Sequence, residues 1–169
     1  MVEVRDRIKE LRRVPASELI PHANNWRRHP QAQRDALSGI LAEVGFADAV
    51  LVRETPDGLT LVDGHLRADV MQDELVPVLV LDITEEEADK ILLTLDPLAA
   101  MADTDTEALL ALLEQTTVHS AAVDEMLQDL VNGNMPPMPE LGDVIDESIA
   151  DDISICNCPT CGNEHHAVS

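Results

Sequence analysis

The sequence predicts a small α+β domain followed by a helical annex and a cysteine-containing tail. Short β-rich runs alternate with amphipathic helical runs up to about residue 96, and helical spacing alone continues to about residue 131. All three cysteines lie within residues 156–161. The 169 residues suffice for one ordinary domain with an appendage, but not for two full-sized domains.

The first predicted elements are a helix and a hairpin. The helix begins where the polar loop ends at Pro30, a proline that a first turn tolerates, and Gly45 stops it. Its apolar side chains repeat at helical spacing: Ala36, Leu37, Ile40, Leu41 and Val44. Residues 49–54 and 59–63 are β-rich runs. The Thr-Pro-Asp-Gly segment between them is a strong turn signal, so the two runs predict a hairpin.

A helix and a strand follow the hairpin. Helical spacing continues from the Asp-Gly after the second run to Leu75, and residues 76–82 (VPVLVLD) predict a buried strand. Three more helices are then expected. Capping boxes at Thr84 with Glu87 and at Thr104 with Glu107 begin the first two, and Ser120 begins the third.

These elements define the expected domain organisation. Residues 12–96 form the domain, and residues 97–133 form the helical annex. Residues 134–154 are an acidic, proline-containing linker of weak periodicity, and residues 155–169 form the tail.

Charge is distributed unevenly along the chain. The formal net charge is −22, from 11 Lys+Arg against 33 Asp+Glu. Residues 1–67 hold ten basic and ten acidic side chains, so the excess belongs to residues 68–169, where Lys90 is the one basic side chain. The acidic part is therefore not expected to bind DNA directly, whereas the arginine-bearing first part can receive an anion. Base stacking is also disfavoured, because Trp26 and Phe46 are the only aromatic side chains.

The chain carries no signal for a membrane or for secretion. No run approaches the roughly 18 apolar residues of a membrane helix, and the first 20 residues lack the apolar stretch of a secretory signal. We therefore expect a cytoplasmic protein.

Two polar loops are the candidate chemical sites. Residues 62–67 (VDGHLR) lie between a strand and a helix, where Gly64 permits a tight turn and His65 and Arg67 add donors to an anion. Residues 24–30 (NNWRRHP) concentrate further donors before the first helix. Together the loops would cradle a polyphosphate if they met in space, which the sequence alone does not establish.

The ordered set of segments resembles the ParB/sulfiredoxin superfamily. The segments are VPASELIPHANNWRRHP, QAQRDALSGILAEVGFADAVLV and LTLVDGHLRADVMQDELVPVLVLDITEEEADKILLTLD, covering about residues 12–96 and more weakly to 131. The match is closest to the ParB-like domains, including nuclease-type domains, of phages and mobile elements. The resemblance implies a small mixed sheet with helices and a role in phage or mobile-element DNA metabolism.

The resemblance also implies a pocket for a nucleoside triphosphate, CTP or ATP, with Mg²⁺. Gly64, His65 and Arg67 match the family's phosphate-binding turn, and the opposing loop and helix supply Arg27, Arg28, His29 and Gln33. Two differences from the family's motifs narrow the expected activity. The segment lacks the cysteine of sulfiredoxins, so sulfinic-acid reduction is not expected, and no Lys or Arg follows Lys90 to serve a DNA-reading helix. Whether the domain hydrolyses a nucleotide or acts as a nuclease stays open.

The tail carries a second candidate site. Residues 158–162 (CPTCG) form the turn used by zinc ribbons, in which two thiolates grip a tetrahedral metal ion. Cys156 and either His165 or His166 would complete four ligands with Cys158 and Cys161. A structural zinc site, a site completed by a second chain and a metal-free tail are the alternatives.

Two classes of function follow from the sequence. The first is a nucleotide-binding domain, in a bacterial or phage-infected cell, with a protein partner in DNA metabolism. The second is a non-enzymatic adaptor that recruits a protein through its acidic helices and zinc tail. The sequence leaves the nucleotide and the oligomeric state open, a homodimer included.

Overall fold

The computed structural model describes residues 4–133, 155–157 and 164–166. The chain divides into two compact units, Met1–Met135 and Pro136–Ser169. Among the described residues, no helix combines the length and apolar character needed to cross a membrane.

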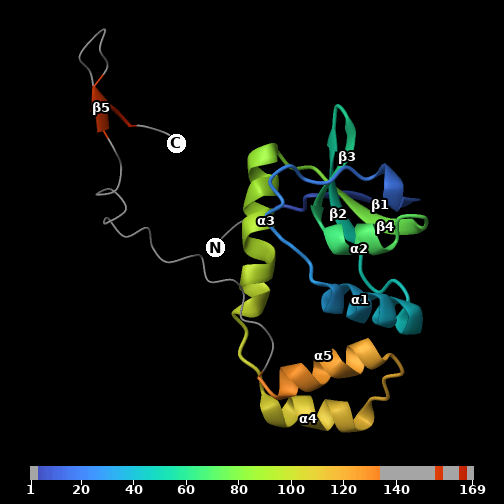
Figure 1. Cartoon of the computed structure of the whole chain (residues 1–169). Coiled ribbons are helices and arrows are strands. Elements are labelled where there is room, and N and C mark those ends of the chain that lie inside the picture. Colours follow the sequence, from blue (N-terminus) through green and yellow to red (C-terminus); the bar gives the residue numbers. More distant parts are fainter. Residues whose placement is uncertain (1–3, 134–154, 158–163, 167–169) are drawn as a thin grey trace. The chain divides into compact units, whose positions relative to one another are not determined.

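The first unit contains a four-stranded mixed sheet (Figure 1). Its strands are β1 (Ile8–Pro15), β2 (Val50–Thr55), β3 (Gly58–Asp63) and β4 (Leu75–Leu81), in the order β1-β4-β2-β3. β4 pairs antiparallel with β1 and parallel with β2, while β2 and β3 form the predicted hairpin. The α+β fold class is thereby confirmed.

Strand β1 was not predicted. Its sequence, IKELRRVP, contains five consecutive charged or leucine positions with no alternation of apolar and polar residues, and most of it is exposed. It becomes a strand because its backbone pairs with the buried β4 from Ile8 opposite Leu81 to Pro15 opposite Leu75. Tertiary pairing, not local pattern, determines this strand.

Three helices and one 3₁₀ turn surround the sheet. They are η1 (Ala16–Glu18), α1 (Gln31–Val44), α2 (His65–Val70) and α3 (Glu85–Ala100). Helix α1 ends at Gly45 as predicted, and Thr84 with Glu87 forms the predicted capping box of α3. Helix α2 is shorter than predicted, because the chain turns at Met71 and Leu75 already pairs with Pro15 as the first residue of β4.

The annex consists of α4 (Thr106–Gln115) and α5 (Ala121–Val131). The N-cap of α4 is Asp105, whose side chain accepts the N–H of Ala108, so the expected capping box of Thr104 with Glu107 is wrong by one residue. Helix α5 packs on α1, and Gly39 of α1 lies against Ser120 and Val123. In Figure 1, α1 lies between the sheet and this helical pair.

The core is aliphatic, as the scarcity of aromatic residues requires. It is built mainly from η1, α2 and one face of the sheet: Ala16, Leu19, Val50, Val52, Leu61, Ala68, Val76, Val78 and Val80. Phe46 packs against it from the connection between α1 and β2. The valines of the central strands are fully buried, which makes the sheet a firm support for the loops at its edge.

The second unit contains a two-stranded antiparallel sheet of β5 (Ile155–Asn157) and β6 (Glu164–His166). Cys156 lies opposite His165 in its register. The other two expected metal ligands, Cys158 and Cys161, lie outside the described residues.

Candidate functional site

The two polar loops meet at the end of strand β3. After η1 the chain runs beside β3, where Ile20 donates its N–H to Leu59 O at 2.8 Å and accepts the N–H of Leu61 at 2.8 Å. This pairing delivers the following loop, residues 22–30, to Gly64 and His65. The contact that closes the site is a 3.2 Å hydrogen bond from His22 N to His65 Nε2.

Gly64 makes the turn between β3 and α2. Its φ is +87° and its ψ is +22°, in the left-handed region that favours glycine. A Cβ at this position would lie 3.1 Å from a methyl carbon of Val50, in the core. The glycine therefore serves both the turn and the close packing of α2 on the sheet.

Backbone donors determine the hydrogen positions of two histidines. Because His22 N donates to Nε2 of His65, the neutral His65 ring carries its hydrogen on Nδ1. Asn24 N donates in the same way to His22 Nδ1 at 3.2 Å, which leaves His22 Nε2 to face Asp89, 3.7 Å away. His22 is itself buried.

His65 is a neutral donor. Its burial lowers the pKa of the imidazole to about 4, an effect that the charge of Asp63 opposes and those of His22, His29 and Arg27 reinforce. Near neutral pH the side chain thus offers an N–H to a ligand without adding positive charge.

Arg27 lies at the centre of the site. Its guanidinium stands 4.9 Å from the ring centroid of Trp26 and forms an ion pair with Asp96 of α3. Burial lowers the pKa of Arg27, and Asp63 opposes that shift. The loop is held in place around it, since Asn25 Oδ1 accepts the N–H of Arg27 at 3.2 Å and Asn24 Nδ2 donates to Asp89 at 3.0 Å.

Two other arginines are tied into ion pairs. Arg34 of α1 pairs with Asp69 of α2, and hydrogen bonding from Arg34 lowers the pKa of that carboxyl. Arg67 pairs with Asp48 at 2.6 Å and Asp63 at 3.5 Å and donates to Ala49 O at 3.1 Å. Arg67 therefore fastens the start of β2 to α2.

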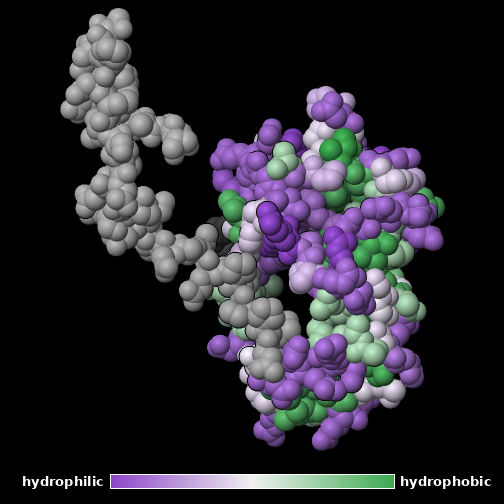
Figure 2. All heavy atoms as spheres, viewed as in Figure 1, coloured by the Kyte–Doolittle hydropathy of each residue, from purple (hydrophilic) through white to green (hydrophobic). Residues whose placement is uncertain are grey.

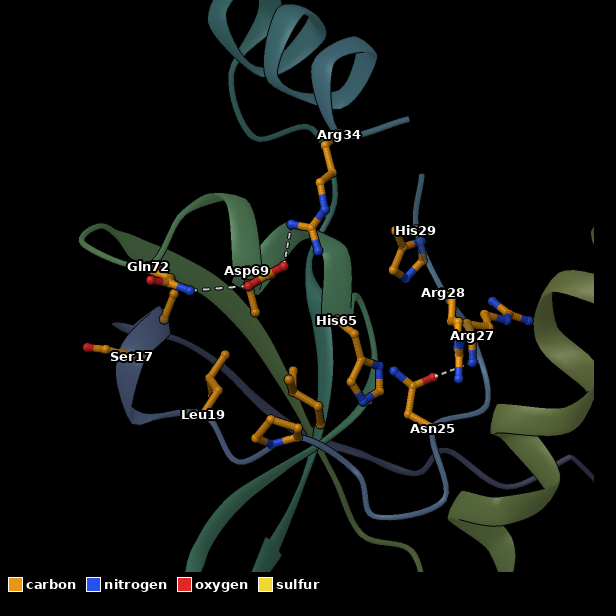
Figure 3. A pocket seen from close by; sticks show the side chains of 14 residues that line it. Ser17, Leu19, Asn25, Arg27, Arg28, His29, Arg34, His65, Asp69 and Gln72 are labelled. Atoms are coloured by element: carbon orange, nitrogen blue, oxygen red, sulfur yellow. Dashed lines mark hydrogen bonds and ion pairs between the residues drawn. The ribbon is translucent and has the colours of Figure 1, made fainter. Parts of the chain in front are cut away.

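Two cavities adjoin at the meeting point of the loops. The polar cavity, about 710 Å³, is lined by η1, the 22–30 loop and one side of α2 (Figure 3). Its charged lining consists of Arg27, Arg28, Arg34 and Asp69, with a net positive charge. Among the residues that the structure describes, Arg28 forms no ion pair.

The apolar cavity, about 550 Å³, lies between α1, α3 and α5. Its lining is mainly aliphatic, and its two arginines, Arg27 and Arg67, are balanced by Asp63 and Asp96. Four residues line both cavities: Asn25, Arg27, His29 and His65. Figure 2 shows hydrophilic side chains over much of the face viewed, with hydrophobic ones reaching the surface at its lower end, where α4 lies.

The structure distributes the predicted loop residues over both cavities. Arg27, His29 and His65 line both cavities, and Arg28 lines the polar cavity. The remaining predicted residues line the apolar cavity: Gln33, Gly64 and Arg67. His29 Nδ1 lies 3.0 Å from Gln33 Oε1, so these two residues contact each other at the start of α1. Figure 3 shows His65, Asn25 and Arg27 grouped on one side and the Arg34, Asp69 and Gln72 contacts on the other.

Several residues in or beside the cavities were not among the binding residues predicted from the sequence. Arg34, Asp69 and Asp96 belong to helix positions whose spacing is that of any solvated helix face, and His22 belongs to the polar loop but outside its basic run. Their importance arises from contacts between elements far apart in sequence. Of these, only His22, one residue after Pro21, had a local signal: a histidine entering the loop.

The arrangement suits binding of an anion. Three guanidiniums and a neutral imidazole N–H converge on one net-positive cavity, with hydrogen-bonding side chains such as Asn25, Ser17 and Gln72 around it. The carboxylates that could serve two-metal chemistry, Asp63 and Asp69, each face an arginine instead.

Comparisons with known proteins identify the fold. The sequence matches no protein-family model and no curated protein. The structure resembles C-terminally truncated chromosome-partitioning protein ParB from Caulobacter crescentus, complexed with CTP-gamma-S, with a TM-score of 0.54 and 20% identity over 74% of this chain and 86% of that one. Sulfiredoxin from Arabidopsis thaliana aligns with a TM-score of 0.38 and 14% identity over 49% of this chain and 97% of that one. The chain has a ParB-like fold.

Proposed function

We propose that the first unit binds a nucleoside triphosphate, with the phosphates between the 22–30 loop and the Gly64–His65 turn. The observation that carries the proposal is the convergence of these loops on a cavity with three arginines and one carboxylate. The ParB of the same fold is complexed with a CTP analogue, which supports a nucleotide as the anion.

The residues have distinct roles in this proposal. Arg27 and Arg28 bind phosphate oxygens, and His65 donates Nδ1–H to one of them. Arg67 keeps its contacts to Asp48 and Ala49 and so holds the turn, while the polar cavity accommodates the nucleoside. A Mg²⁺ ion would accompany the triphosphate, neutralising part of its charge.

Isothermal titration with CTP, ATP, GTP and UTP, each with and without Mg²⁺, tests the proposal. Arg28→Ala should weaken binding of the preferred nucleotide by about tenfold or more, because a hydrogen bond to a charged group contributes about 1.5–3 kcal/mol. Arg13→Ala is the matched control, since Arg13 is exposed on β1, outside both cavities. Wild-type protein that binds none of the four nucleotides would refute the proposal.

Hydrolysis and nuclease activity need separate measurements. Phosphate release from the bound nucleotide would show that the site positions a water for attack. Cleavage of plasmid DNA with Mg²⁺ would support the nuclease alternative, which the ion-paired state of Asp63 and Asp69 does not favour. Identifying the protein partner of the nucleotide-bound form would test the proposed role in phage or mobile-element DNA metabolism.

An adaptor function is the second candidate, and the exposed leucines of the annex favour it. Helix α4 has no buried residue, and Leu110 and Leu112 are exposed on it, as are Leu93 and Leu98 on α3. Replacing the exposed Leu110 and Leu112 by glutamine should abolish binding of a protein partner but leave nucleotide affinity unchanged. Removing residues 136–169 tests the tail in the same way.

We also propose that the tail binds Zn²⁺ through Cys156, Cys158, Cys161 and His165. The register of β5 and β6 supports Cys156 and His165 as ligands of one ion, because facing residues of antiparallel strands have Cα atoms about 4.5–5.5 Å apart. Cobalt substitution should give the absorption of a tetrahedral thiolate site, and Cys158→Ser should change it. His165→Ala and His166→Ala distinguish the fourth ligand.

A further inference from the structure

The two helices of the annex leave an apolar groove between them. A cavity of about 390 Å³ lies between α4 and α5, and its apolar lining comes from both helices and their connection: Leu113, Val118, Leu127 and Val131. Leu112 lies one helical turn before Thr116, which also lines the cavity, and its side chain is 63% exposed. Apolar surface therefore continues from the cavity onto α4. We call the cavity together with Leu112 the annex groove.

Helix α4 offers most of its apolar surface to solvent. It packs on α5 but buries none of its ten residues, whereas α5 buries Val123 against Gly39 of α1. In Figure 1, α4 lies on the side of α5 that faces away from α1. Among the described residues, no further element covers α4, so the annex groove is accessible to a partner.

The charges around the annex groove have one sign. Residues 105–131 contain no Lys or Arg and six carboxylates: Asp105, Glu107, Glu114, Asp124, Glu125 and Asp129. The ion pairs of the described residues all lie between residues 5 and 96, so none involves these six. Residues outside the described ranges contain no Lys or Arg either. A cation for these carboxylates must therefore come from another molecule.

This charge pattern discriminates between possible occupants of the annex groove. A second copy of the chain would bring the same six carboxylates to the contact, and like charges across an interface oppose association. An uncharged apolar helix would cover the leucines but give the carboxylates no partner. A helix with one apolar face and Lys or Arg beside that face complements both the apolar surface and the charge.

We propose that the annex groove binds a cationic amphipathic helix of a partner protein. An apolar side chain of that helix enters the cavity, and a neighbouring Lys or Arg pairs with Asp124, the charged residue among the described lining. Oδ2 of Asp124 accepts a 2.8 Å hydrogen bond from Gln128 Nε2, and Oδ1 faces the incoming cation. This inference rests on the adaptor function and deepens it, because it states the chemistry of the partner, and it does not depend on the nucleotide site.

Fluorescence anisotropy with the full chain tests the proposal. The probe is a labelled peptide of about 14 residues, or about four helical turns, with leucine on one face and lysine elsewhere. A peptide of the same composition in scrambled order has the same charge but no apolar face, and a third peptide carries glutamate in place of lysine. We expect the amphipathic cationic peptide to bind at least about tenfold more tightly than the scrambled one, equivalent to about 1.4 kcal/mol. The glutamate peptide should not bind.

Two substitutions locate the contact. Leu112→Gln should weaken binding of the amphipathic cationic peptide about tenfold, whereas Leu93→Gln, at a 60% exposed position of α3 outside the cavity, should not. Asp124→Asn should weaken it about threefold. Asp57→Asn makes the same charge change at the exposed tip of the β2–β3 hairpin and is the control. Amide hydrogen exchange of α5 in the free variants shows that the annex stays folded, and Leu112→Ala replaces the glutamine variant if it does not.

Several outcomes would overturn the proposal. Equal affinity for the ordered and scrambled peptides, or equal affinity of Leu112→Gln and Leu93→Gln, would reduce the contact to general attraction by an acidic protein. A dimer in sedimentation equilibrium that Leu112→Gln dissociates would make a second copy the occupant. Absence of peptide binding would also refute the cationic partner.

These failures are distinguishable from failure of the adaptor function. A protein partner that binds Leu112→Gln normally but is lost when residues 136–169 are removed would keep the adaptor function and refute the annex groove. The nucleotide titrations do not involve the annex and stand apart from either result.

Discussion

At the scale of single residues, one backbone N–H determines the chemistry of His65. The N–H of His22 occupies Nε2, so protonation of that atom would break a hydrogen bond within a partly buried site. The same ring in a solvated loop would be a titrating cation near neutral pH. From the sequence, His65 could be identified as a donor, but its neutral state depends on a loop that begins 43 positions earlier.

The low pKa of His65 predicts a pH dependence of stability. The folded-state pKa is about 4 and the ordinary value is 6.5, so between these values the unfolded chain binds a proton that the folded chain does not. The stabilising contribution is complete above pH 6.5 and is lost as the pH falls toward 4. Denaturant unfolding at several pH values should show a shallower loss for His65→Gln than for the wild type. His119→Gln, at an exposed position, should leave the slope unchanged.

Gly64 provides a second prediction at this scale. Gly64→Ala should destabilise the fold by about 1–3 kcal/mol, because alanine is strained in the left-handed backbone conformation and its Cβ would crowd Val50. Gly133→Ala is the control, since Gly133 has a φ of +69° but open space around its Cβ position. Equal losses of free energy of unfolding in the two variants would show that the contact with Val50 contributes nothing.

At the scale of elements, the helix termini show what a local pattern can predict. The capping box of Thr84 and Glu87 forms, and Glu87 also receives two 2.8 Å hydrogen bonds from Arg7, which lower the pKa of that carboxyl to about 2 together with the backbone N–H of Thr84. The cap was readable from the sequence. The link to Arg7 was not, because it joins α3 to the residue before the unpredicted strand β1.

At the start of α4, the cap expected from the sequence pattern differs from the cap that the structure forms. Asp105→Ala should destabilise this helix by about 1 kcal/mol, whereas Thr104→Ala should change it little, because the side chain of Asp105 accepts the N–H of Ala108. Helix α4 buries no residue, so the loss will be local. Amide hydrogen exchange of residues 106–115 is the suitable measurement, and a larger effect from Thr104→Ala would restore the capping box expected from the sequence.

The elements that the sequence predicted well are those whose own residues supply the reason. The apolar stripe of α1, the turn at residues 55–58 and the valines of β4 act within one segment. Strand β1 has no such pattern, and α2 was overextended because Leu75 fits both the helical stripe and the strand that follows. Only pairing with β1 decides between these two roles for Leu75.

At the scale of the whole molecule, the site is a product of topology. The sequence indicated two donor-rich loops, and the pairing of Ile20 with β3 brings them together. It could not indicate which carboxylates would pair with the arginines, because the partners Asp48, Asp69 and Asp96 come from three other segments. Carboxylates of this chain, whose net charge is −22, therefore form specific ion pairs with the arginines of the site. A ligand anion must displace these carboxylates or avoid them.

Separation of the annex from the rest of the first unit can be tested with a single substitution, without deleting any residues. A Cβ on Gly39 would clash with Ser120 Oγ and lie 3.0 Å from a methyl carbon of Val123, so α5 approaches the backbone of α1 directly. Glu43 reinforces this contact by accepting the N–H groups of His119 and Ser120. A side chain at position 39 must push α5 away, although any residue other than proline would stabilise an isolated helix by up to about 1 kcal/mol relative to glycine.

Gly39→Leu should therefore separate the annex from the domain while the domain stays folded. Amide hydrogen exchange should show lost protection in α5 and retained protection in the buried strand β4. Ser38→Leu, on the exposed side of α1, is the control. The phosphate contacts proposed here come from Arg27, Arg28 and His65, none of which belongs to the annex, so triphosphate affinity should stay within about threefold of the wild-type value. Loss of binding in Gly39→Leu with an intact β4 would instead place part of the ligand against α5, in the apolar cavity.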